Sequence, residues 1–191
     1  VKNIRWVLDQ QSSNGWFNNC GFYDELPITH TIIYTLRGLL ECELTDPESL
    51  ADLNLMDAVI KSVNNLCSAV GSQSVKGVEG MMPSAFDENW NGIVKDSCLT
   101  GNMQFAILLY RLSHIVKDNK VYLKTAGLIV SATKRTQVID TSMKEIKGAL
   151  AGSFPFYNGY VDNGYPNWAA KFLADALIMK IKYKEKVIVK A

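Results

Sequence analysis

The stretch FAILLYRLSHIV, residues 105–116, carries apolar side chains on nearly every side of the helix that its spacing predicts. A helix that is apolar all round must be covered on several sides. By contrast, residues 47–71 show a single apolar stripe, which is typical of a helix with one face in solvent. The two kinds of helix together favour an inner layer of buried helices wrapped by an outer layer of amphipathic ones.

Helical spacing continues on both sides of this stretch, and convincing alternating strands are missing, so the sequence predicts an all-α protein. The chain already looks helical at its start. One helix is expected to begin at Pro47 with Asp46 as its cap, and Arg37 and Glu41 are expected to pair four residues apart. The further helices are expected over residues 29–41, 47–71, 100–117, 119–137, 142–150 and 166–184.

Three connecting segments resemble one another: NGWFNNCGFYDELPITHT, GMMPSAFDENWNGIVKDSCLTGN and GSFPFYNGYVDNGYPNWAAK. Each begins with glycine and bulky apolar residues, continues through Asn, Asp and aromatic residues, and ends at an apolar helix. Their first glycines, Gly15, Gly80 and Gly152, lie 65 and 72 residues apart. Such an interval holds two helices and their connections, so the chain is predicted to form about three αα-hairpins. With alternating inner and outer helices, the predicted fold is an α/α toroid in the form of a partial barrel.

Size and charge narrow the function classes. A chain of 191 residues with 48% hydrophobic content can bury one core, so we expect a single domain over 1–191 that is part of a longer chain. The 20 basic and 19 acidic residues balance, which gives no argument for nucleic acid as a partner. No apolar run reaches the length of a membrane span. The four cysteines form no C-x-x-C motif, which favours a reducing, cytoplasmic location.

The segment QSSNGWF, from Gln11 to Phe17, resembles the Q-x3-G-x-W repeat motif of terpenoid cyclases, with one spacer residue missing before the tryptophan. Together with the hairpin repeat, the chain resembles the toroids of terpenoid cyclases and protein prenyltransferases. In that family the glutamine caps a helix end and the tryptophan stacks to stabilise the repeat. Closed toroids of this kind have five to seven hairpins, so the resemblance implies the C-terminal part of a larger barrel. Exposed edges of such a part would favour a homo-oligomer.

If the hairpins alternate as predicted, the three connectors enter the inner helices at their N-termini and gather at one rim. Helix N-termini offer free N–H groups and the positive ends of helix dipoles, which suit a phosphate, a carboxylate or a polar sugar. The alternative is a purely structural role, in which the tryptophans pack between hairpins. The predicted ligand-binding residues are Trp16, Tyr23, Trp90, Asn102, Gln104, Tyr160, Asn167, Trp168 and Lys171.

Three residues are catalytic candidates: His30, Asp24 and Asp162. His30 stands at a predicted helix start, where the dipole lowers a histidine pKa and favours a neutral base or hydrogen-bond donor. Asp24 could form a carboxylate pair with Asp87 or Asp162, as in glycosidases built on α/α barrels. Aspartates are equally common in turns, so the turn interpretation stays open.

The catalytic motifs of the resembled family are missing from this sequence. The acidic D-x-D-D or D-C-T-A-E element of terpenoid cyclases is absent, and the two histidines form no usable zinc motif with a cysteine. Glycine-rich phosphate loops are absent as well, so no cofactor and no metal are predicted. The leading hypothesis is a prenyltransferase-like or cyclase-like toroid that binds a small ligand, isoprenoid or sugar, at its rim. The alternatives are a carbohydrate-processing or polysaccharide-biosynthesis protein and a non-catalytic helical-repeat binding module.

Overall fold

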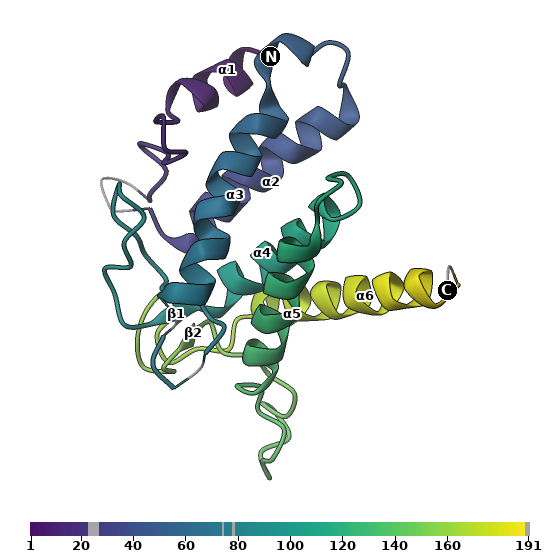
Figure 1. Ribbon diagram of the computed structural model, residues 1–191. Helices are drawn as coiled ribbons and strands as arrows, with labels where there is room; N and C mark the ends of the chain where they lie inside the picture. The colour runs from purple at the N-terminus through teal and green to yellow at the C-terminus, as the bar shows by residue number, and fades with distance from the viewer. Residues whose placement is uncertain (23–26, 74, 78, 190–191) are drawn as a thin grey trace.

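The structure, a computed structural model, describes residues 1–22, 27–73, 75–77 and 79–189, with 184–189 described by their backbone alone. These residues are mostly helical, which confirms the all-α class (Figure 1). A short 3₁₀ turn and a two-stranded antiparallel sheet complete the described elements. The helices are α1 (Lys2–Asp9), α2 (Thr29–Thr45), α3 (Leu55–Ser72), α4 (Leu99–Leu112), α5 (Lys120–Lys134) and α6 (Asn167–Val189); the turn is η1 (Ala51–Leu53), and the strands are β1 (Ser97–Cys98) and β2 (Ser153–Phe154).

Helix α4 lies at the centre of the core. It packs against α2, α5 and α6, while α3 packs against α2 and α5. Every residue of α4 except Arg111 is buried, as its all-round apolar sequence predicts. Helices α3 and α5 cover the core with one apolar face each and lie in front of α2 and α4 in Figure 1. The described fold therefore contains the two predicted kinds of helix: α4 is buried on nearly all sides, and α3 and α5 each bury one face.

The predicted start of one helix is wrong. The helix expected from Pro47 begins only at Leu55, because Asn54 adopts a left-handed backbone with φ of 50°, and such a residue interrupts a right-handed helix. Asp46 instead accepts a hydrogen bond from the Ser49 N–H at 3.3 Å, within a turn of its own.

The helix expected over 142–150 does not form. Val138 donates a backbone hydrogen bond to the Ala149 oxygen at 3.0 Å and accepts one from the Gly148 N–H at 2.6 Å. These bonds close residues 138–149 into a loop. Gly148 has a φ of 86°, which a continuous α-helix cannot accommodate.

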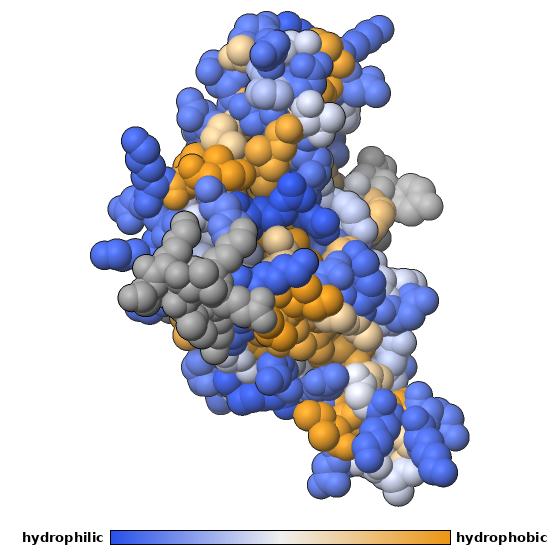
Figure 2. Space-filling view, turned by 90° about the vertical axis from the view of Figure 1, so that its right-hand side faces the viewer, coloured by the Kyte–Doolittle hydropathy of each residue, from blue (hydrophilic) through white to orange (hydrophobic). Residues whose placement is uncertain are grey.

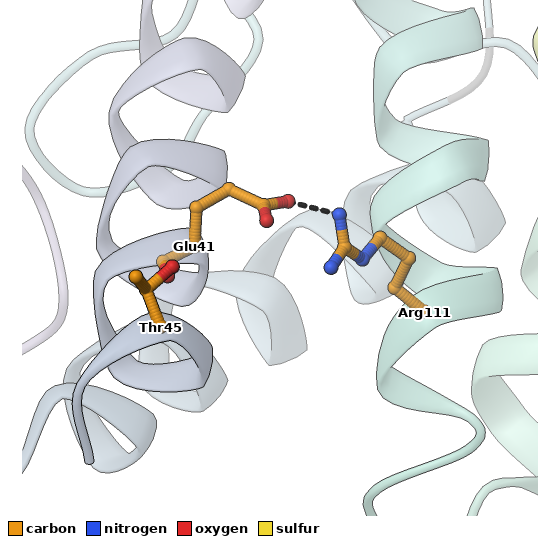
Figure 3. Close-up of polar contacts among 3 residues, drawn as sticks. All are labelled: Glu41, Thr45 and Arg111. Atoms are coloured by element: carbon orange, nitrogen blue, oxygen red, sulfur yellow. Dashed lines mark hydrogen bonds and ion pairs between the residues drawn. The ribbon is translucent and has the colours of Figure 1, made fainter.

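The predicted pairing of Arg37 with Glu41 is also wrong. Glu41 on α2 forms its ion pair with Arg111 on α4 (Figure 3). The Thr45 hydroxyl donates to the Glu41 backbone oxygen at 2.7 Å, one turn further along the same helix. Because the ion pair joins two inner helices far apart in sequence, the helix spacing of α2 alone could not reveal it.

The side of the molecule toward which α6 points carries a patch of apolar residues (Figure 2). On α6 itself, Ile178 and Ile181 are 49% and 56% exposed. Pairing with a second copy of the chain stays a prediction. Among the described residues, none of the helices combines the length and the hydropathy needed to span a bilayer.

Candidate functional site

The three connecting segments lie against one another near the N-termini of α2 and α4. The Thr29 N–H at the start of α2 donates to the Ser84 oxygen at 2.7 Å. The Leu99 N–H at the start of α4 donates to the Gly152 oxygen at 3.0 Å, and β1 pairs with β2 beside it. Backbone hydrogen bonds therefore join the first connector to the second and the second to the third.

Two glycines permit this close approach. A Cβ atom built on Gly101 of α4 would lie 2.9 Å from the Thr29 Cγ2 atom and 3.0 Å from the His30 backbone nitrogen. Gly159 has a φ of 90°, and a Cβ there would collide with the Asp96 carboxylate. Asp96 is buried and accepts a hydrogen bond from the Ser84 hydroxyl, so the third connector packs directly on a polar contact of the second.

His30 lies at the junction of α2 and α4 and is only 7% exposed. Its Nδ1 atom lies 3.0 Å from the Gln104 Oε1 atom. Because an amide oxygen can only accept, Nδ1 carries the proton and Nε2 of the neutral ring keeps its lone pair. Burial lowers the pKa of His30 below its ordinary value, and the hydrogen bond to Gln104 opposes that shift. His30 is thus held as a neutral hydrogen-bond acceptor.

Aromatic rings surround this histidine. The Tyr34 ring meets the His30 ring edge-on, with centroids 4.8 Å apart, and the Tyr160 ring lies 4.7 Å away at a tilt. Burial raises the pKa of the Tyr160 hydroxyl, while a side-chain hydrogen bond with Trp168 lowers it. Tyr160 therefore links the third connector to both α2 and α6.

A second group of side chains continues from Tyr34 along α2 and α6. The Phe172 ring lies 6.5 Å from the Tyr34 ring, 5.6 Å from the Arg37 guanidinium carbon and 4.4 Å from the Lys171 ammonium nitrogen. Lys171 also pairs with Asp175 at 2.7 Å. We call this set the inner-helix face; it comprises His30, Tyr34, Arg37, Gln104, Tyr160, Trp168, Lys171, Phe172 and Asp175.

An open pocket of about 460 Å³ adjoins the inner-helix face, and it is lined by His30, Tyr34, Thr31, Thr35, Asn19, Cys20, Gly21 and Phe22. Beside it, Trp168 exposes 44% of its surface. Ligand-binding sites commonly combine exposed aromatic rings with a few polar groups. The pocket and the face can therefore receive one small ligand together.

The remaining predicted residues lie elsewhere. Trp16 and Trp90 are both 5% exposed and pack edge to face on each other at 5.3 Å, which is a packing role. Gln11 donates to the Ala58 oxygen at 2.9 Å and to the Ser62 hydroxyl at 3.0 Å. It thus binds within α3 and holds the first connector there.

Asn102 is fully buried and satisfies its amide within the connectors, through Ser97, the Cys98 oxygen and the Met82 N–H. Asn167 and Asp162 are exposed at the surface of the third connector and α6. Asp87 accepts three hydrogen bonds from Asn89 and Asn91, as a turn aspartate does. Tyr23 and Asp24 lie outside the described residues.

Sequence reasoning missed Tyr34, Arg37 and Phe172. Tyr34 and Arg37 stand four and seven residues after His30, and these intervals place all three on one side of a helix. Tyr34 and Arg37 are an aromatic and a charged residue in an otherwise apolar helix, and this could have marked them as candidate site residues. Phe172 had no such signal, because an apolar residue in an inner helix is expected to be core.

No protein-family model matches this chain, and no curated protein matches it either. Within the described residues, no cluster of three or more His, Cys, Asp or Glu could hold a metal ion.

We expect nuclear magnetic resonance titration to give His30 a pKa below 6.5, and Gln104→Leu to lower it further, because the lost hydrogen bond favours the charged ring. The chain has two histidines, so His30→Gln assigns the signal. A lowered pKa means that the unfolded chain binds the proton first. The histidine therefore weakens the fold progressively as the pH falls from 6.5 through the folded pKa. An unchanged pKa in Gln104→Leu would contradict the assigned contact.

Proposed function

We propose that the αα-hairpins belong to an α/α toroid and that the protein binds a carbohydrate on its inner-helix face. A toroid turns its inner helices toward a central opening, and the inner-helix face is the side of α2, α4 and α6 on which their polar and aromatic residues gather. The same helices pack their apolar sides into the core. This arrangement supports a ligand site facing that opening.

The observation that carries the proposal is the mixture of aromatic and planar polar groups. Tyr34, Tyr160 and Trp168 offer rings, and next to them lie the His30 imidazole and the Gln104 amide. Sugars present apolar C–H faces that stack on rings and hydroxyls that bind planar polar groups. The Gln104 Nε2 atom is buried and has no hydrogen-bond partner among the described residues, although buried donors normally have one.

An isoprenoid is the second candidate ligand, as the resemblance to prenyltransferases and cyclases implies. The rings of Tyr34, Phe172 and Trp168 would shield an allylic cation by their π-faces. Carbohydrate is favoured over this candidate because charged and amide groups alternate with the rings. In either case His30 is the proposed proton acceptor, since its Nε2 lone pair is free in the neutral tautomer.

Tryptophan fluorescence tests the proposal. We expect oligosaccharides from a neutral and acidic panel to quench the fluorescence in a saturable manner. Trp168→Ala should weaken binding about 2- to 13-fold, because stacking on a ring contributes roughly 0.5–1.5 kcal/mol. Trp6→Ala is the matched control, since Trp6 is 56% exposed on α1 and does not line the pocket beside the inner-helix face.

The outcomes separate the candidates. Saturable binding of farnesyl diphosphate with no response to any sugar would favour the isoprenoid. A response to neither would indicate the helical-repeat binding module. Equal losses in Trp168→Ala and Trp6→Ala would remove the inner-helix face as the site.

A further inference from the structure

Arg37 is a cation without a counter-charge. Among the described residues, no carboxylate pairs with it, and its guanidinium carbon lies 5.6 Å over the Phe172 ring. The Nε atom of Arg37 is buried and has no hydrogen-bond acceptor among the residues that the structure describes. An unsatisfied N–H donor of a charged group costs free energy, and arginine in such a place normally meets an anion.

The other charges of the region are already neutralised. Lys171 pairs with Asp175 at 2.7 Å, and Arg111 pairs with Glu41. The unbalanced positive charge of the inner-helix face is therefore that of Arg37. It lies over the Phe172 ring, which also contacts the Tyr34 ring and the Lys171 ammonium group.

We infer that the ligand of this face is an acidic saccharide, whose carboxylate or phosphate binds to Arg37. The inference rests on the proposed carbohydrate function. A guanidinium is a flat fork of donors that matches the two oxygens of a carboxylate or phosphate, and an aromatic ring beneath it fixes the plane of the fork. Tyr34 stands one turn before Arg37 on α2, so a sugar ring that stacks there would carry its acidic group to the guanidinium.

Matched ligands test this charge preference directly. Calorimetric titration of the full chain would compare trigalacturonate with its methyl ester, which has the same rings and no charge, and glucose 6-phosphate with glucose. We expect one acidic member to bind at least about tenfold more tightly than its neutral counterpart. Since Arg37 is only partly buried, high salt should reduce that preference by screening.

Variants test whether the preference for acidic saccharides depends on Arg37. Arg37→Gln should abolish the difference in affinity between the acidic and the neutral member of a pair, while Arg37→Lys should retain part of that difference. Arg135→Gln is the control, because Arg135 is exposed after α5 and binds only backbone oxygens. The thermal midpoint of each variant identifies any that fails to fold, and the salt dependence of the unchanged protein then decides.

Each outcome has one meaning. A preference in the carboxylate pair or in the phosphate pair supports the inference and identifies the source of the anion. Equal binding of acidic and neutral members, or a preference that Arg37→Gln retains, overturns the inference while the carbohydrate function stands. No binding by any sugar overturns the proposed function and the inference together.

Discussion

Replacing Gly159 by alanine is expected to destabilise the protein by about 2–4 kcal/mol, through two separate causes. Its φ of 90° is unfavourable for any residue with a Cβ atom. The added Cβ would also collide with the Asp96 carboxylate and approach the Ser153 hydroxyl oxygen to 3.0 Å. Asp96 is buried and hydrogen-bonded to Ser84, so it cannot move aside without losing that bond. Thermal unfolding should show a midpoint lower by roughly 5–15 °C.

Gly148→Ala separates the two causes. Gly148 has a nearly equal φ of 86°, but no atom lies within 4 Å of the position of its Cβ. We expect this control to lose only about 1–2 kcal/mol, which is the cost of the backbone conformation. If both variants lose the same free energy, the collision with Asp96 contributes nothing, and the packing of the third connector on the second is looser than the contact indicates.

The burial of α4 was predictable because burial leaves a direct trace in sequence. Residues 105–112 are apolar on nearly all sides, and α4 is buried on all sides. The ends of the helices were harder to predict from the sequence. The left-handed Asn54 delays α3, and no propensity rule distinguishes it from a helical asparagine.

The candidate site was only partly predictable. The sequence grouped His30, Gln104, Tyr160 and Trp168, because all four stand in or near the segments that precede or begin α2, α4 and α6. It also included Trp16 and Trp90, which the structure buries against each other. The difference depends on which way each ring turns from its connector. That direction follows from packing between distant segments, which a local pattern does not contain.

Gly101→Ala connects the stability of the fold with the site, and we expect a loss of about 2 kcal/mol. An alanine in a helix normally gains roughly 0.5–1 kcal/mol over glycine. Here the new methyl group would press on the Thr29 side chain and the His30 backbone nitrogen. Thr29 cannot rotate away, because it is fully buried and its hydroxyl donates to the Pro83 oxygen at 2.7 Å. Helix α2 must therefore move away from α4, which lengthens the contact between His30 and Gln104. Gly127→Ala on α5 has open space around its Cβ and should instead stabilise the protein. Chemical denaturation of both variants measures the difference, and a gain of equal size in each would show that α2 and α4 are not held together at this glycine.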